Sequence, residues 1–277
     1  MNQFNSTYNI ARSNIGFENE VDRLRVQALM SWEKEFRNLK WFGLSDGMKV
    51  LEVGCGPGFV TEKLVEHLPK SGISALDIDD SLLAKAKQRL NKITDRDIEF
   101  IQASVYDTGL QDNGYDFVIA RLVFLHLFEP KKAAIEIFRV LKPGGKLVIM
   151  DVDDGIFGII EPTVENFRSV IDKLIAMQGE AGGNREIGRS LPRLLESSGF
   201  CNVEMDAISV HSDLVGVEMV KEQFNPKRFE AFYKKGSLSK SDFQSIEKAF
   251  ENLQQNPDSL AMMIFFMACG TKPVSDT

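Results

Sequence analysis

The segment from Val50 to Phe59 constrains the fold of this chain more than any other part of the sequence. An apolar run that carries the acidic Glu52 leads straight into a turn that contains Gly54, Gly56 and Gly58, and an amphipathic segment follows at once. Glycine lets the backbone turn sharply and lets a ligand lie against bare main chain, where a Cβ atom would clash. The segment therefore predicts a strand, a turn and a helix that form a cofactor site of the nucleotide-binding type.

The spacing of these glycines separates the turn from two common phosphate-binding loops. The dinucleotide fingerprint G-x-G-x-x-G needs a third glycine where this chain has Phe59. A P-loop needs G-x-x-x-x-G-K-[ST], which does not occur here. The pattern in this chain is instead E-x-G-x-G-x-G from Glu52 to Gly58.

Strands and helices are expected to alternate along the chain. The periodicity predicts strands at residues 49–53, 73–78, 98–103, 117–120, 146–152, 202–210 and 261–268. It predicts helices at residues 18–39, 59–68, 81–93, 131–141, 164–174, 187–195 and 215–255. Alternation of this kind implies an α/β fold, with a parallel sheet and helices on both faces.

The chain is expected to form one elaborated unit. The helices inserted at residues 156–198 and 213–258 are flanked by strands of the main sheet, so we interpret them as lid insertions rather than a separate domain. Residues 1–45 are predicted to form an N-terminal helical lid, and residues 46–277 the cofactor-binding core.

Composition excludes several other classes of protein. The net charge of −7 over 277 residues does not support a broad nucleic-acid footprint. Cys55, Cys201 and Cys269 are widely spaced, which indicates a reducing compartment and no metal site of the zinc type. Residues 1–14 are polar, unlike a signal peptide, and no run is long enough for a membrane span, so a cytoplasmic location is expected.

Several motifs together resemble those of class I S-adenosylmethionine (SAM)-dependent methyltransferases. Glu52 to Gly58 is similar to motif I of that family, and Leu141 to Ile149 resembles the motif that precedes its fifth strand. The resemblance extends over most of the chain. Within the family, the chain is similar to small-molecule methyltransferases of the ubiquinone and menaquinone biosynthesis type. The resemblance implies a Rossmann-like, seven-stranded, mostly parallel sheet with helices on both faces, an antiparallel last strand and helical lid insertions.

The same resemblance implies the residues that bind SAM or its product S-adenosylhomocysteine. They are Glu52, Gly54, Cys55, Gly56, Gly58, Asp77, Ile78, Ser104, Val105, Arg121, Leu122, Tyr8 and Arg23. Asp77, at the end of the second strand, can accept hydrogen bonds from both hydroxyls of a ribose. This feature is shared with NAD sites. Ser104 stands where many relatives carry an aspartate that binds the adenine amino group.

Two residues and one aromatic run each allow two interpretations. Arg121 suits the SAM carboxylate or the substrate, but it also suits a salt bridge between elements. His126 is a weak catalytic candidate as a general base, although its apolar surroundings favour a structural, hydrogen-bonded histidine. The run Phe224, Phe229, Phe232 and Tyr233 suits an apolar acceptor or plain helix packing.

The leading functional prediction is transfer of a methyl group from SAM to a small-molecule acceptor by in-line displacement, in a pocket closed by the lid. Positioning of the acceptor and exclusion of water carry much of such a reaction, which leaves little catalytic signature in a sequence. The alternatives are an NAD(P)-dependent Rossmann oxidoreductase and a SAM-binding protein that has lost catalysis. RNA or protein methylation is disfavoured by the acidic charge and the absence of an Asn/Asp-Pro-Pro-Tyr-type motif.

Overall fold

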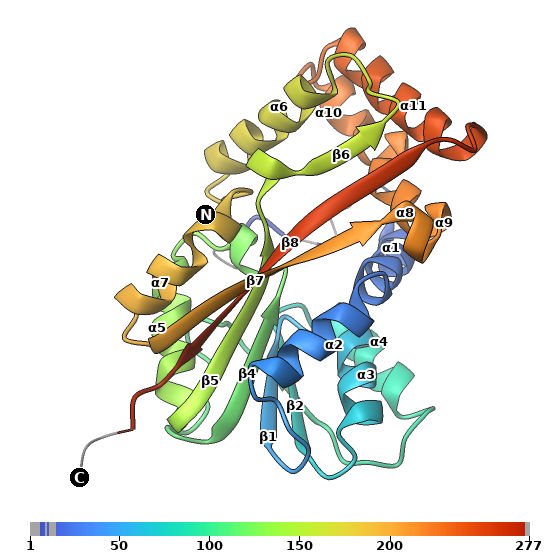
Figure 1. The fold of residues 1–277 in the computed structure, drawn as a ribbon. Helices are drawn as coiled ribbons and strands as arrows, with labels where there is room; N and C mark the ends of the chain where they lie inside the picture. Colours follow the sequence, from blue (N-terminus) through green and yellow to red (C-terminus); the bar gives the residue numbers. More distant parts are fainter. Residues whose placement is uncertain (1–5, 9, 11–14, 275–277) are drawn as a thin grey trace.

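The computed structural model describes residues 6–8, 10 and 15–274, and Figure 1 shows their arrangement. Within that part of the chain, eight strands form one mixed sheet in the order β3-β2-β1-β4-β5-β8-β6, with β7 paired to β8. The strands are β1 (Lys49–Val53), β2 (Gly72–Asp77), β3 (Glu99–Gln102), β4 (Tyr115–Arg121), β5 (Leu141–Val152), β6 (Gly158–Glu161), β7 (Cys201–His211) and β8 (Leu260–Thr271).

The strand directions confirm the predicted Rossmann-like architecture. β1 runs parallel to β2 and β4, β2 to β3, and β4 to β5. The last strand, β8, is antiparallel to β5, β6 and β7. The eighth strand, β6, was not predicted. It has only four residues, and it forms because β8 extends past the end of β5 and leaves an edge that β6 pairs with.

Helices cover both faces of the sheet, as predicted. The α-helices are α1 (Phe17–Leu29), α2 (Trp32–Trp41), α3 (Phe59–His67), α4 (Asp80–Leu90), α5 (Pro130–Val140), α6 (Phe167–Glu180), α7 (Leu191–Ser197), α8 (Ser212–Val215), α9 (Val217–Lys221), α10 (Glu230–Lys234) and α11 (Lys240–Gln255). The 3₁₀ helices are η2 (Phe124–His126), η3 (Asp154–Ile156), η4 (Ile187–Ser190), η5 (Glu222–Phe224) and η6 (Pro226–Arg228).

Alternation along the strands explains the two layers. In β1, Val50 packs into the apolar cluster beneath α2, α3 and α4, whereas Leu51 packs into the cluster beneath α5 and α7. Successive side chains of a strand point to opposite faces, so a strand that is apolar at both positions must be covered on both sides.

The predicted helix over residues 18–39 is wrong as one helix, because the chain breaks between α1 and α2 at Met30 and Ser31. In a continuous helix the Gln27 carbonyl would accept a hydrogen bond from the Ser31 N–H. Here that carbonyl oxygen accepts from Nη2 of Arg121 at 2.7 Å. A side chain from the sheet therefore takes the place of one helical hydrogen bond.

Residues 215–255, predicted as helical throughout, form several short helices before α11 begins. Gly216 and Gly236 have positive φ angles of 88° and 79°, and Pro226 starts a 3₁₀ turn, so no long helix can run through them. α11 begins with a reciprocal capping box formed by Ser239 and Asp242. Figure 1 places α6, α10 and α11 together at the β6 end of the sheet.

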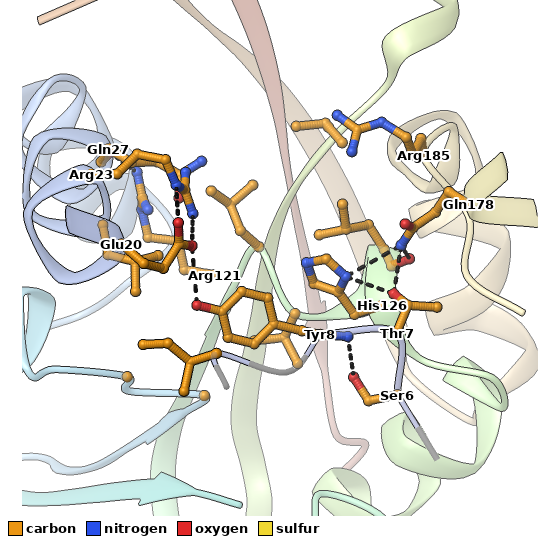
Figure 2. Close-up of a pocket in the computed structure, with 18 of the residues that line it drawn as sticks. Ser6, Thr7, Tyr8, Glu20, Arg23, Gln27, Arg121, His126, Gln178 and Arg185 are labelled. Atoms are coloured by element: carbon orange, nitrogen blue, oxygen red, sulfur yellow. Dashed lines mark hydrogen bonds and ion pairs between the residues drawn. The ribbon is translucent and has the colours of Figure 1, made fainter. Parts of the chain in front are cut away.

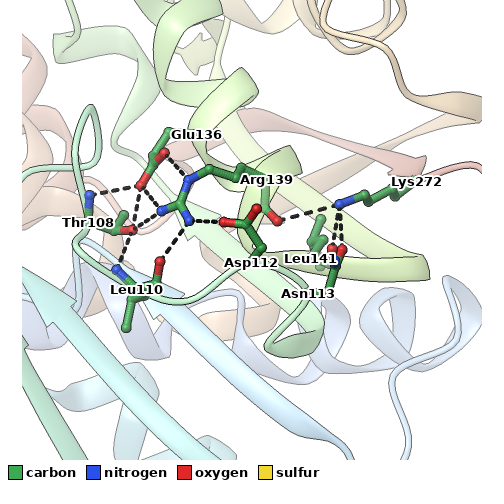
Figure 3. A network of polar contacts seen from close by, with 8 residues as sticks. All are labelled: Thr108, Leu110, Asp112, Asn113, Glu136, Arg139, Leu141 and Lys272. Atoms are coloured by element: carbon green, nitrogen blue, oxygen red, sulfur yellow. Dashed lines mark hydrogen bonds and ion pairs between the residues drawn. The ribbon is translucent and has the colours of Figure 1, made fainter.

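A polar network closes the end of the sheet at which β4 and β5 begin (Figure 3). Arg139 of α5 donates to Asp112 at 2.5 Å and to Glu136 at 2.7 Å, and Nζ of Lys272 donates to the Leu141 carbonyl at 2.7 Å. These bonds attach the loop before β4 and the end of β8 to α5. The opposite end of the sheet, where the parallel strands finish, is left for a ligand site.

Within the described part of the chain, no helix combines the length and the apolar character that crossing a bilayer would need. The same residues contain no cluster of three or more histidine, cysteine, aspartate or glutamate side chains able to hold a metal ion.

Candidate functional site

A cavity of about 640 Å³ lies at the carboxyl ends of β1, β2 and β4. The sheet forms its floor, and side chains of α1, α6 and residues 223–232 form its walls. Part of the cavity lining is shown in Figure 2. All the predicted cofactor residues except Gly58 line this cavity.

The three glycines of the turn have three different structural roles. All have positive φ angles, of 71° for Gly54, 52° for Gly56 and 78° for Gly58. A Cβ atom on Gly54 would lie 2.4 Å from Cγ2 of Val123, and one on Gly58 would lie 3.0 Å from the Ala86 side chain. A Cβ atom on Gly56 would meet no protein atom within 4 Å. Gly56 is therefore the position where bare main chain faces the cavity.

The Asp77 carboxylate holds the turn and faces the cavity. It accepts hydrogen bonds from the backbone N–H of Gly56 at 2.7 Å and of Asp79 at 2.9 Å. Burial raises the pKa of Asp77 above its usual range. Two carboxylate oxygens have more acceptor sites than these two bonds use, so the group can still accept from a diol. Ile78 follows it on the cavity wall.

Glu52 and Cys55 complete the turn as buried groups. Oγ1 of Thr61 donates to Glu52 at 2.6 Å, and burial raises the pKa of Glu52 to about 8. Burial also raises the pKa of the Cys55 thiol. A buried carboxyl with a raised pKa near a cavity is a common property of ligand sites.

Ser104 and Val105 line the cavity after β3, where the resemblance placed an adenine contact. Oγ of Ser104 accepts from the backbone N–H of Tyr106 at 3.2 Å. A hydroxyl oxygen has two lone pairs, so Oγ of Ser104 can still accept a second hydrogen bond from a ligand amino group.

Arg121 lines the cavity but is held by the N-terminal helices. Its Nε donates to Oε2 of Glu35 at 2.8 Å and its Nη2 donates to Oε1 at 2.9 Å, and both side chains are buried. The salt bridge between elements, one of the two readings of Arg121, is present. The next residue, Leu122, has a φ of 54°, which is unusual for a leucine, and it too lines the cavity.

Tyr8 and Arg23 meet in the cavity through Glu20, a residue that the sequence interpretation missed. Oη of Tyr8 donates to Glu20 at 3.2 Å, and Arg23 donates to both Glu20 oxygens at 2.6 and 3.0 Å (Figure 2). Burial raises the pKa of Tyr8. The aromatic ring of Tyr8 lies 5.3 Å from that of His126, between centroids.

His126 is hydrogen-bonded on one ring nitrogen. Nε2 of Gln178 lies 3.1 Å from the Leu125 carbonyl, 2.6 Å from Oγ1 of Thr7 and 3.2 Å from Nδ1 of His126. A carbonyl only accepts, which identifies that Gln178 atom as the amide nitrogen. Oγ1 of Thr7 also lies 2.8 Å from Nδ1 of His126, where a hydroxyl can donate or accept.

In the tautomer in which Nδ1 accepts from Thr7, the proton of the neutral ring lies on Nε2. Burial lowers the pKa of His126 to about 3, and Arg185 and Arg23 act in the same direction. His126 is thus neutral near pH 7 and presents an N–H. Figure 2 shows its second ring nitrogen on the side away from Thr7 and Gln178, toward the middle of the cavity.

Phenylalanine rings form the opposite wall. The ring centroids of Phe157, Phe167 and Phe224 lie 5.8 to 6.3 Å apart. Phe229 and Phe232 also line the cavity, and they pack against the buried cluster of Val170, Leu238 and Ile246, so both readings of this run stay open. Tyr233 does not, because it stacks on Phe243 at 4.8 Å and is 37% exposed.

Comparison with known proteins agrees with this geometry. Residues 51–149 match the family model described as "Methyltransferase domain". A ubiquinone/menaquinone biosynthesis C-methyltransferase from Wigglesworthia glossinidia brevipalpis is 30% identical over 174 residues, which cover 58% of this chain and 70% of the relative. An uncharacterized methyltransferase from Schizosaccharomyces pombe is 32% identical over 111 residues, which cover 38% of this chain and only 40% of that protein.

Solved structures share the fold at low sequence identity. Phosphoethanolamine N-methyltransferase 2 from Haemonchus contortus, in complex with phosphomonomethylethanolamine and S-adenosylhomocysteine, has a TM-score of 0.57 at 20% identity. The match covers 87% of this chain and 53% of that one. A putative methyltransferase from Bacillus halodurans has a TM-score of 0.54 at 17% identity, and the match covers 96% of that protein.

Proposed function

This chain belongs to the class I SAM-dependent methyltransferases, enzymes whose cofactor is S-adenosylmethionine, and from that premise we propose that it methylates a small-molecule acceptor inside this cavity. The observation that carries the proposal is the continuity of one cavity from the glycine turn to the phenylalanine wall. A site for an extended polymer would need an open groove, whereas this cavity has walls from the sheet, from α1 and from α6.

The cofactor fits the turn on the evidence of Gly56 and Asp77. The space where a Cβ of Gly56 would point is open, and the buried carboxylate of Asp77 lies on the same wall. Asp77 would bind the ribose hydroxyls, Ile78 and Val105 would flank the adenine, and Tyr8 with Arg23 would face the amino-acid end. When bound, SAM supplies a methyl group activated on a sulfonium.

The residues of the chain then need to position the acceptor and exclude water. In the tautomer in which Nδ1 accepts from Thr7, the Nε2–H of His126 donates a hydrogen bond to an oxygen of the acceptor. In this tautomer His126 orients an acceptor oxygen rather than removing a proton. The phenylalanine wall binds the apolar part of the acceptor.

Titration calorimetry with SAM, S-adenosylhomocysteine and NADH tests the cofactor, and transfer of radiolabel from methyl-labelled SAM to a small-molecule extract tests the activity. We expect heat from the first two ligands and label in the organic phase. Heat from NADH alone would support the oxidoreductase alternative. Binding without any transfer to small molecules would support the non-catalytic alternative.

We also propose that the N-terminal segment of residues 1–45 and the insertions at 156–198 and 213–258 close over the acceptor. α1, α6 and residues 223–232 contribute cavity side chains, which supports this role. Within 156–198, α7 packs against α5 and β7, so the closing part is expected to end before η4.

Hydrogen exchange with and without S-adenosylhomocysteine tests closure. Residues 17–29 and 156–180 should gain protection while the sheet near Val148 changes less. Equal protection in both states would show a rigid, preformed cavity. A cytoplasmic location stays a prediction of the cysteine pattern, and cell fractionation checks it.

A further inference from the structure

Three further arginine side chains line the cavity besides Arg121, and two of them are not explained by the cofactor motifs. Arg23, Arg185 and Arg228 all line it, from α1, from the loop before η4 and from η6. Arg23 adjoins the predicted amino-acid end of the cofactor and is paired with Glu20. Arg185 and Arg228 belong to the inserted segments, where the cofactor motifs do not reach.

Arg185 is held in a defined orientation. Its Nε donates to Oδ2 of Asp154 at 2.5 Å, and Asp154 is buried. Among the described residues, Nη1 and Nη2 of Arg185 have no hydrogen-bond partner. A guanidinium fixed through Nε presents its two terminal nitrogens as a fork that fits a carboxylate or a phosphate. Figure 2 shows this guanidinium above His126, on the same side of the cavity as Gln178.

Arg228 adds positive charge nearby. It is partly buried, and it donates to the Gln223 carbonyl and, at 3.5 Å, to Oε1 of Gln223. Burial lowers the pKa of Arg228, and the positive charges of Arg23 and Arg185 act in the same direction. The negative charges of Glu20 and Glu222 act in the opposite direction, so Arg228 lies within electrostatic reach of two carboxylates as well as of the two arginines.

The arginine fork and the phenylalanine wall meet at η3. Asp154, which holds Arg185, begins this 3₁₀ helix, and Phe157 is its C-cap residue. Phe157 lies against Phe167 and Phe224. One ligand can therefore contact the charged group and the aromatic rings at once.

Resting on the function proposed above, we propose that the methyl acceptor is an amphipathic anion, with a carboxylate or phosphate bound by Arg185 and an apolar or aromatic body against Phe157, Phe167 and Phe224. Arg185 determines specificity for the anionic group and takes no part in cofactor binding. His126 then lies between this anion and the cofactor turn, where an acceptor oxygen would be oriented.

Calorimetry on the full chain saturated with S-adenosylhomocysteine tests this, with 1-naphthoate, 1-naphthyl phosphate and 1-naphthylmethanol as probes. The two anions share an aromatic body with the neutral alcohol, so the comparison isolates the charge. We expect at least one anion to bind roughly tenfold or more tightly than the alcohol, as charged hydrogen bonds usually do. Equal affinity of all three probes would overturn the proposal, and the stronger anion identifies carboxylate or phosphate.

Three variants assign the effect to Arg185. Arg185→Gln should lower the affinity for the anionic probe to that for the alcohol and leave S-adenosylhomocysteine binding unchanged. Arg193→Gln is the control, on the exposed face of α7, and should change neither of these affinities. Arg185→Gln leaves Asp154 without its partner and therefore could fail to fold. In that case Arg185→Lys replaces it, and this variant should lose most of the anion preference because lysine lacks the two terminal nitrogens of the guanidinium. An anion preference that survives both substitutions of Arg185 would overturn its role.

The outcomes also separate this proposal from the proposed function. If the parent protein fails to bind S-adenosylhomocysteine, the proposed function is wrong. If it binds S-adenosylhomocysteine but shows no anion preference, only the acceptor class is wrong.

Discussion

The two halves of the cavity are built in different ways. The cofactor half is mostly main chain: a turn of positive-φ glycines, a buried aspartate that accepts from two backbone N–H groups, and the ends of three parallel strands. The acceptor half is made of side chains from α1, η3, α6, η6 and β8, which are far apart in the sequence. Backbone geometry needs particular residues at fixed spacing, whereas a wall of side chains can be made in many ways. A short motif therefore marks the first half and no motif marks the second.

The largest effect expected concerns the bare main chain at Gly56. Gly56→Val should abolish S-adenosylhomocysteine binding, because the side chain would fill the cavity. Gly109→Val is the matched control, since Gly109 also has a positive φ, of 67°, and open space around it, but lies outside the cavity. Both variants pay about 1–2 kcal/mol of backbone strain. If calorimetry shows parental affinity for the Gly56 variant, main chain does not form the cofactor surface.

A substitution at Arg121 tests whether this side chain stabilises the fold through Glu35 or contacts the cofactor. Arg121→Met should lower the free energy of unfolding by about 3–5 kcal/mol, because Glu35 would remain buried without its partner. Lys63→Met, which breaks an exposed pair with Glu66, should cost less than about 1 kcal/mol. Urea denaturation measures both. If Arg121→Met has normal stability but binds S-adenosylhomocysteine more weakly, Arg121 contacts the cofactor rather than stabilising the fold.

These two positions also show what the sequence could and could not predict. The glycine spacing and strand–helix alternation predicted the Rossmann-like sheet, because each is a local requirement of the backbone. The break between α1 and α2 could not be predicted, because it depends on Arg121 reaching the Gln27 carbonyl from 94 residues away. β6 was missed for the same reason, since it exists only where β8 extends beyond β5.

The site followed the same rule. The predicted cofactor residues next to the turn and at strand ends line the cavity, whereas Gly58 packs against Ala86 of α4 and does not line it. Glu20, Gln178 and Arg185 were missed. The signal available for Arg185 was weak, because it is a single arginine after two glycines and an asparagine, between two segments interpreted as amphipathic helices.

The pH dependence of stability tests the burial of Glu52. Its pKa is about 8 in the folded protein and 4.5 ordinarily, so the folded state holds the proton more tightly than the unfolded state. The contribution of Glu52 to stability is therefore complete below pH 4.5 and declines as the pH rises toward 8. Between pH 5 and 8, the parent should lose on the order of 3 kcal/mol relative to Glu52→Gln. Urea denaturation curves whose difference is independent of pH would contradict this.

Asp77 tests the polar part of the cofactor half. Asp77→Asn should weaken S-adenosylhomocysteine binding by about 1.5–3 kcal/mol, the range for hydrogen bonds to a charged group. Asp80→Asn is the control, because Asp80 is exposed at the start of α4 and does not line the cavity. Calorimetry at one pH compares them. Equal dissociation constants for the parent and the Asp77 variant would remove this carboxylate from the ribose contact.

The smallest effect is expected at Ser104, where the cofactor half departs from the pattern common among similar methyltransferases. Oγ of Ser104 already accepts from Tyr106, so its contribution to a cofactor is one neutral hydrogen bond, about 0.5–1.5 kcal/mol. Ser104→Ala should weaken S-adenosylhomocysteine binding by that amount. Ser104→Asp should strengthen it by about 1 kcal/mol, because a carboxylate accepts more strongly from an amino group than a hydroxyl does. If calorimetry finds that the aspartate weakens binding while alanine has no effect, the adenine amino group does not lie at Ser104. The edge of the cofactor half would then be defined by the backbone after β3 alone, and the contrast between a main-chain half and a side-chain half would become sharper.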